Sequence, residues 1–169
     1  CAYTSLIAQL EAPADLAKTA VTVLVDKEEI GSVGATGMAS NFFENTIAEI
    51  MELAGEGGML PLRRALTASS MLSSDVSAGF DPAYASVFAP KNAAFPGRGT
   101  VFNQSTGARG NSASNDASAA SVARVRRVMD CAGASFTTAD FGQLAASGGG
   151  PVSYPSPTHV VDVTTHGVA

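Results

Sequence analysis

The sequence predicts an α/β fold, a three-layer sandwich in which a mostly parallel central sheet is flanked by helices. Short apolar or serine-rich runs, typical of strands, alternate with segments whose apolar residues recur at helical spacing. This alternation favours parallel strands joined by helices. The 169 residues match the size of one domain, and no internal repeat is apparent.

The first predicted elements are a helix, a strand and a second helix. Apolar residues recur at helical spacing within residues 2–11, and Pro13 ends that helix. The continuous valine-rich run 20–25 is typical of a strand that is buried on both faces. A loop containing several glycines follows, and residues 38–54 then show a second helical pattern that stops at Gly55.

The middle of the chain predicts a short helix, a strand and a long loop. Residues 60–69 form the helix, and residues 70–74 form a strand that ends at Asp75. Residues 79–100 contain three prolines and are predicted to be a long ordered loop, which in a compact domain is often functional. A further strand begins at residues 101–102.

The last third predicts one helix followed by two strands. Residues 103–114 are polar and contain glycines, and the pair Asn115-Asp116 is expected to start the helix. That helix covers residues 117–132 and stops at Gly133. The remaining strand candidates are residues 136–138 and 160–163.

Composition excludes several classes of function. A net charge of −5 argues against a nucleic-acid-binding protein, which needs clustered lysine and arginine. The longest apolar runs fall short of the roughly 20 residues that span a membrane. The only two cysteines, Cys1 and Cys131, lie far apart and indicate neither a disulfide framework nor a zinc ribbon. We therefore expect a cytoplasmic protein with no membrane or nucleic-acid partner.

Three carboxylates are placed where predicted strands end. Glu28 and Glu29 follow the run 20–25, and Asp75 follows the strand 70–74. Because ligands collect at the carboxyl ends of parallel strands, we expect these side chains to share a site. Glu29 and Asp75 would then be metal ligands, while Glu28 would be free to act as a general base. Two ligands are too few for a tight zinc site, so further ligands are needed.

A rival interpretation uses the glycines at positions 31, 34 and 37. Glycines between a strand and a helix are typical of a nucleotide-binding α/β domain. The spacing G-x-x-G-x-x-G differs from the dinucleotide pattern, however, and Glu28 and Glu29 would repel a pyrophosphate. This interpretation remains an alternative, and no cofactor-binding residue is assigned from it.

An ordered series of short motifs runs along nearly the whole chain. It comprises Cys1–Leu6, Asp26–Ser32, Gly34–Ala35, Ser40–Glu44, Ser73–Val76, Asp81–Tyr84, Thr106–Gly110, Ser114–Ala117 and Gly148–Gly150. The series resembles the signature of the aspartyl aminopeptidase family, which are cocatalytic two-metal zinc aminopeptidases. The first motif alone is moderately specific, and the ordered series is strongly so.

The resemblance implies a zinc-peptidase-like fold and a role for each acid. It implies that Glu28 is the catalytic general base, Glu29 a metal ligand and Asp75 a ligand of the other metal. Two divalent ions are implied, zinc with cobalt or manganese as alternatives, and they activate one water molecule between them. The implied activity removes N-terminal residues from peptides. The implied assembly is a homo-oligomer built from dimers, up to a dodecamer.

The resemblance also implies that residues 1–169 are part of a larger catalytic domain. It places a bridging aspartate, a histidine ligand and an inserted dimerisation domain before Cys1, and a last histidine ligand after Ala169. The tract Asn103–Ser105 departs from the family pattern, which affects the expected substrate contacts. The incomplete ligand set and the low charge keep a second hypothesis open, a non-catalytic scaffold or shell subunit with the same fold.

Overall fold

The computed structural model describes residues 1–103, 105–107, 113–139 and 162–168. The helices are α1 (Ala2–Leu10), α2 (Phe42–Leu53), α3 (Met59–Thr67) and α4 (Ala119–Ala132), with the 3₁₀ helix η1 (Pro82–Val87). The strands are β1 (Ser70–Val76), β2 (Thr100–Asn103), β3 (Ser105–Gly107), β4 (Ala113–Asp116), β5 (Phe136–Ala139) and β6 (Asp162–Val168). No helix in these described ranges is long and apolar enough to cross a membrane.

Four strands form the main sheet, in the order β1-β6-β2-β5. β1 pairs with β6 in parallel, and β2 pairs with β5 in parallel, while β2 and β6 run antiparallel. Two of the three pairings are therefore parallel. Together with the helices, this sheet confirms the predicted α/β class with a mostly parallel sheet.

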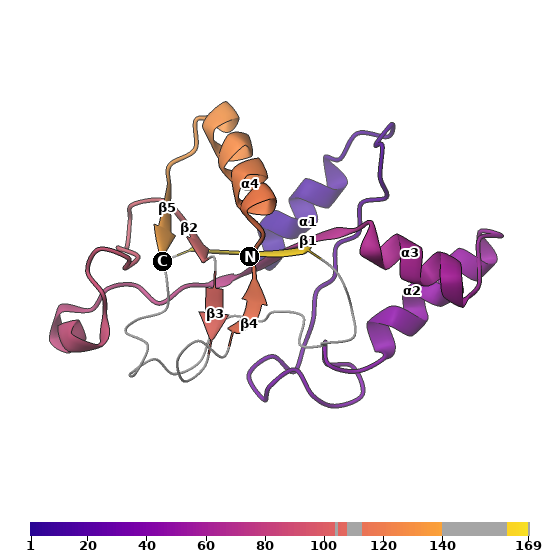
Figure 1. Ribbon diagram of the computed structural model, residues 1–169, viewed down its shortest axis with the longest axis horizontal. Helices are drawn as coiled ribbons and strands as arrows, with labels where there is room; N and C mark the ends of the chain where they lie inside the picture. Colours follow the sequence, from indigo (N-terminus) through magenta and orange to yellow (C-terminus); the bar gives the residue numbers. More distant parts are fainter. Residues whose placement is uncertain (104, 108–112, 140–161, 169) are drawn as a thin grey trace.

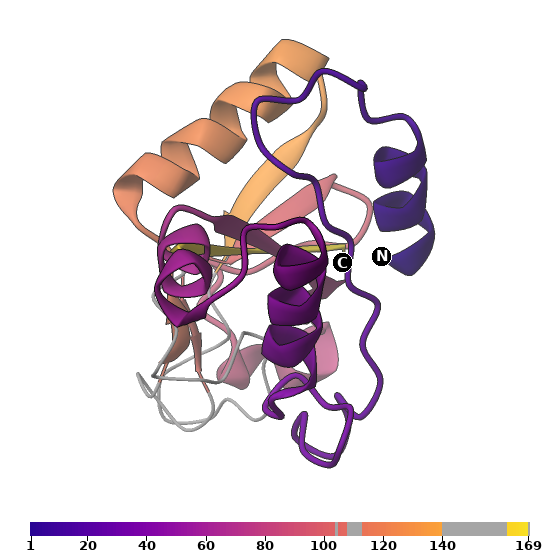
Figure 2. The same cartoon turned by 90° about the vertical axis from the view of Figure 1, so that its right-hand side faces the viewer.

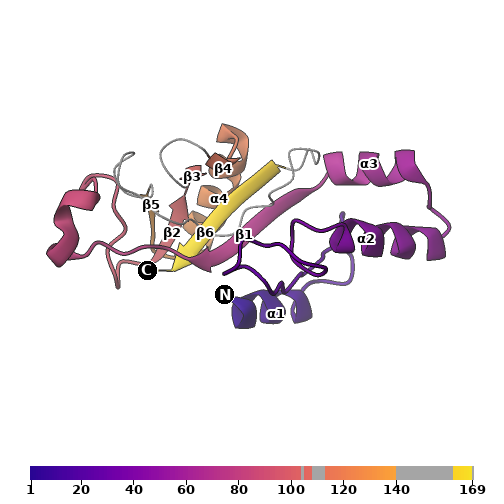
Figure 3. The same ribbon diagram turned by 90° about the horizontal axis from the view of Figure 1, so that it is seen from below.

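The helices and a small hairpin surround this sheet (Figures 1 and 2). α4 lies on one side of the sheet, and the antiparallel hairpin of β3 and β4 lies on the other. α2 and α3 pack against each other beyond the beginning of β1, which Figure 3 shows from below. Since α3 leads directly into β1, this helix pair stands at the opposite end of β1 from Asp75.

The interior is small and centres on β2. Val101 is completely buried and forms a cluster with Ala94 and Ala139, which come from the long loop and from β5. Phe102 packs against Phe136 edge to face, with ring centroids 5.5 Å apart. The side chains of β2 thus hold together segments that are distant in the sequence.

The first and last predicted helices are confirmed, and the last one starts later than predicted. α1 and α4 occupy the predicted ranges, and α4 ends at Gly133, which adopts the left-handed conformation that stops a helix. The predicted start of α4 at Asn115-Asp116 is wrong, because these residues belong to β4. Ser118 caps the helix instead, accepting a hydrogen bond at 3.1 Å from the backbone of Ser121.

The prediction of a doubly buried strand at residues 20–25 is wrong. The segment has no strand structure, and Val21, Val23, Leu24 and Val25 are between 40% and 58% exposed. A valine-rich run indicates a preference for extended backbone, but burial on both faces also requires that the run joins a sheet whose two faces are covered by other elements. No described strand pairs with this segment, so its apolar side chains face outward.

Several other elements begin or end at residues different from those predicted. The predicted helix 38–54 begins only at Phe42, because the preceding residues belong to the glycine-containing loop. The polar stretch 103–114, for which no strand was predicted, contains β3 and the first residues of β4. The predicted strands 70–74 and 136–138 are confirmed as β1 and β5, and the final strand lies slightly later, as β6. The motif residues 108–110 and 148–150 lie outside the described residues.

Candidate active site

Asp75 lies near the carboxyl end of β1, as predicted. Asp75 belongs to β1, which pairs in parallel with β6, and in this register Asp75 lies opposite Gly167. Its side chain is half-buried, and its Oδ1 accepts a hydrogen bond at 2.7 Å from the backbone of Val76. The main sheet therefore determines the position of this carboxylate.

Glu28 and Glu29 lie in a tight turn rather than at the end of a strand. The Gly31 backbone donates to the Glu28 carbonyl at 2.8 Å, and the Ser32 backbone donates to the Lys27 carbonyl at 2.8 Å. Lys27 and Ser32, the two residues that close the turn, have φ angles of 65° and 59°. This left-handed conformation costs a residue with a side chain about 1–2 kcal/mol, so surrounding contacts must maintain it.

The three predicted acids come together around Glu28. The half-buried position of Glu28 raises the pKa of its carboxyl, and the negative charges of Asp75 and Glu29 raise it further. Asp75 reaches this neighbourhood from β1, whereas Glu28 and Glu29 reach it from the turn. The structure therefore places all three within electrostatic reach of one another. A raised pKa is typical of a carboxylate that acts as a general base.

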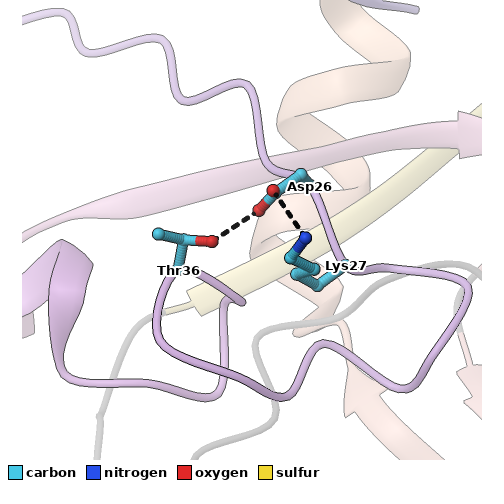
Figure 4. A network of polar contacts seen from close by, with 3 residues as sticks. All are labelled: Asp26, Lys27 and Thr36. Carbon is cyan, nitrogen blue, oxygen red and sulfur yellow. Dashed lines mark hydrogen bonds and ion pairs between the residues drawn. The ribbon is translucent and has the colours of Figure 1, made fainter.

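A polar network, shown in Figure 4, joins the two sides of the acidic turn. The Thr36 hydroxyl donates a hydrogen bond at 2.8 Å to Oδ1 of Asp26, and Lys27 Nζ lies 3.4 Å from Oδ2 of the same carboxylate. The bond from Thr36 is the main cause that lowers the pKa of Asp26, and the charge of Lys27 acts in the same direction. Asp26 is thus ionised, and its carboxylate contacts Thr36 and Lys27 of the same loop.

A second set of contacts fastens the turn to the start of α2. Ser32 is buried, and its carbonyl accepts a hydrogen bond at 2.9 Å from the backbone of Ala39. Gly37 lies so close that a Cβ there would overlap the carbonyl oxygens of Ser32 and Val33. The sequence alone assigned no role to Thr36, and it singled out Gly37 only for the nucleotide-binding alternative. Their position gave the sequence signal for a role, because this hydroxyl and this glycine lie at the end of the glycine-containing loop.

The carboxylates are the right kind of donors for a divalent ion, but they do not form a complete cage. Among the described residues, no three histidine, cysteine, aspartate or glutamate side chains lie close enough to hold a metal ion together. Repulsion between carboxylates acts over longer distances than coordination, which explains how the acids influence Glu28 without forming a cluster. A cation among them would relieve that repulsion, and additional ligands would be needed to hold it.

The nucleotide alternative gains no support from the geometry. The strand expected before the glycines is absent, and Gly37 is required by close packing within the loop rather than by open space for a phosphate. The negative side chains of Glu28 and Glu29 occupy the turn where a pyrophosphate would have to bind.

Comparison with known proteins gives consistent matches. A family model described as aminopeptidase I zinc metalloprotease (M18) matches residues 1–153. A probable M18 family aminopeptidase 1 from Clostridium acetobutylicum is 49% identical over 169 residues, which are 100% of this chain and 36% of that protein. The corresponding protein from Thermotoga maritima is 37% identical over 154 residues, which are 90% of this chain and 34% of that protein.

Solved structures agree with the sequence comparisons. The crystal structure of an M18 family aminopeptidase from Thermotoga maritima superposes with a TM-score of 0.88 at 36% identity, covering 99% of this chain and 37% of that one. The crystal structure of aminopeptidase I from Clostridium acetobutylicum gives a TM-score of 0.84 at 47% identity, covering 100% and 36%. The chain thus spans about a third of the length of the relatives that it matches.

Proposed function

Because the chain belongs to the M18 family of aminopeptidase I zinc metalloproteases, we propose that the full-length protein is a metal-dependent aminopeptidase. Its substrates are peptides, from which it removes N-terminal residues. The single observation that supports this most directly is the position of Glu28, whose pKa is raised by partial burial and further by the charges of Asp75 and Glu29. These acids come from two segments that are well separated in the sequence, so the fold is needed to bring them together.

In this proposal Glu29 and Asp75 hold metal ions, each contributing carboxylate oxygens to a different ion. Bound divalent ions, zinc with cobalt or manganese as alternatives, supply Lewis acidity and lower the pKa of water. Carboxylate oxygens are suitable ligands for all three metals. The remaining ligands belong to parts of the full-length protein outside the described residues.

Glu28 is the proposed general base. Its carboxylate accepts a proton from the attacking water and delivers that proton to the nitrogen of the departing amine. Efficient proton transfer requires a base whose pKa approaches the working pH, and partial burial beside two other acids moves Glu28 in that direction. A carboxylate in an ordinary solvated turn would be a weaker base.

The decisive test is the metal dependence of hydrolysis by the full-length protein. We expect release of N-terminal residues from peptides, loss of activity after chelation, and recovery when zinc, cobalt or manganese is added. Acetylation of the peptide's N-terminus should prevent cleavage, since an aminopeptidase requires the free amine. Cleavage that continues at the same rate after chelation would overturn the proposal.

The second candidate is a non-catalytic scaffold or shell subunit. The observation that favours it is the absence of a complete metal cage among the described residues, together with many exposed apolar side chains. Metal analysis of the purified full-length protein separates the two functions. Stoichiometric zinc or cobalt supports the enzyme, and a protein that assembles but retains no metal supports the scaffold.

We also propose a cytoplasmic homo-oligomer, built from dimers and up to a dodecamer in size. The exposed apolar residues of α1 and of residues 21–25 support association, because such side chains are usually covered in an assembly. Both cysteines are free and exposed, which fits a reducing compartment. Light scattering on the full-length protein measures the assembly size, and a stable monomer would contradict the oligomer.

A further inference from the structure

The turn that presents the two glutamates is held by its own loop. Its backbone closes on itself through the two bonds from Gly31 and Ser32, with Lys27 and Ser32 in the left-handed conformation. Such residues leave this conformation readily unless neighbouring contacts hold them. The position of Glu28 and Glu29 therefore depends on whatever keeps the ends of the turn in place.

One of those ends is held by a single pair of side chains. The Thr36 hydroxyl donates a hydrogen bond to Asp26 at 2.8 Å, and this bond links the residue just before the turn to a residue four positions after Ser32 (Figure 4). Lys27, whose Nζ lies 3.4 Å from Asp26, neutralises part of the carboxylate's charge. The other end of the turn is held by the backbone bond from Ala39 to Ser32.

We propose that Thr36 is a positioning residue for Glu28 and Glu29, acting through its hydrogen bond to Asp26. The inference rests on the proposed function, because it assigns Thr36 a role toward the same acids. Thr36 itself contacts no reacting group in this scheme. It limits the freedom of the turn, so that the two carboxylates keep the spacing that metal binding and proton transfer require.

Removal of the hydroxyl should therefore act on three measurable properties. The amides of Gly31 and Ser32 should lose protection from hydrogen exchange, because the turn opens more often. The affinity for zinc should fall by about tenfold, the lower end of the effect usual for residues that orient ligands. The kcat for a peptide should fall while KM changes little, since the substrate's own contacts are untouched.

The experiment compares Thr36→Val with Thr36→Ser in the full-length protein. Valine matches threonine in shape but cannot donate, whereas serine keeps the hydroxyl. Thr46→Val is the matched control, since Thr46 is an exposed threonine in α2 whose hydroxyl bonds at 2.8 Å to the Phe42 carbonyl. We expect losses in Thr36→Val, near wild-type behaviour in Thr36→Ser, and no change in Thr46→Val. Equal exchange of the Gly31 and Ser32 amides in Thr36→Val and wild type would overturn the inference.

A double-mutant cycle identifies the partner of the hydroxyl. Asp26→Asn keeps a carbonyl oxygen that can accept the bond, and Asp26→Ala removes it. We expect Asp26→Ala to reproduce the Thr36→Val losses, with no further loss when the two are combined. Fully additive losses would mean that the two residues act separately, and the inference would be wrong.

Failure of the proposed function looks different from failure of this inference. A wild-type protein that neither binds zinc nor cleaves peptides removes the proposed function, whatever the variants do. The exchange of the Gly31 and Ser32 amides still tests the role of Thr36 in that case, because it depends on neither metal nor substrate. Unchanged exchange in Thr36→Val refutes the positioning role even if the enzyme is active.

Discussion

The turn around Glu28 and the strand that ends near Asp75 position their carboxylates by different means. The turn is closed by hydrogen bonds between residues close in the sequence, ending with Thr36 and Asp26. Asp75 instead depends on β1, which pairs along its length with β6, near the far end of the chain. Local contacts thus shape one half of the site and long-range sheet pairing the other. A change in the side-chain contacts of the loop should affect mainly the site, whereas a change in the sheet should affect mainly the stability of the whole fold.

The largest expected effect comes from replacing Glu28, the proposed general base in the turn. Glu28→Gln keeps the size of the side chain but removes the proton acceptor, so kcat should fall by about 10²–10⁴. Zinc content should remain that of the wild type, because Glu28 is not a proposed ligand. The measurement is peptide hydrolysis together with metal analysis of the same sample, and ordinary turnover by this variant would show that another group is the base.

A substitution at a buried residue of β2 tests the contribution of the main sheet to stability. Val101 is completely buried, so Val101→Ala should reduce the free energy of unfolding by about 2 kcal/mol through lost apolar contact and a remaining cavity. Val128→Ala is the control, because Val128 is 60% exposed on α4 and should change the same quantity by less than about 0.5 kcal/mol. Denaturant unfolding of the full-length protein compares them. Equal losses would mean that Val101 is not a core residue.

Substitutions at two glycines test the local contacts of the loop that carries Glu28 and Glu29. Gly37→Ala forces a Cβ against the Ser32 and Val33 carbonyls, which should cost about 1–3 kcal/mol and displace the turn. Gly34→Ala meets open space and only has to adopt a φ of +88°, at a cost of about 1 kcal/mol. Unfolding midpoints and zinc affinities should therefore be lower for Gly37→Ala than for Gly34→Ala, and the reverse order would contradict the described packing.

The smallest effect is a pH dependence of stability in the metal-stripped protein. The pKa of Glu28 is higher in the folded state than in the unfolded state, since burial and the neighbouring acids disfavour its charge. Its contribution to stability is therefore present below the unfolded pKa and is lost as the pH rises through the folded pKa. Glu28→Gln does not undergo this loss. Thermal midpoints of the variant and the wild type should diverge in favour of the variant as the pH rises above the ordinary glutamate pKa, and a constant difference would exclude the shift.

Elements that depend on nearby residues followed from the sequence. The helix stop at Gly133 and the helical spacing of residues 2–11 both describe interactions within a few residues, and both were predicted correctly. The failure at residues 20–25 has the opposite cause. Valine favours extended backbone, yet whether that backbone becomes a buried strand depends on partners elsewhere in the fold.

Residue types and their order along the chain were enough to indicate an α/β domain, to single out Glu28, Glu29 and Asp75, and to suggest the family. Only the folded chain revealed which hydrogen bonds close the turn around the glutamates, that Asp75 lies near enough to raise the pKa of Glu28, and that Thr36 reaches Asp26. Side-chain chemistry is a property of each residue by itself. Electrostatic coupling and hydrogen bonding depend on distances in space, which a pattern of letters does not contain.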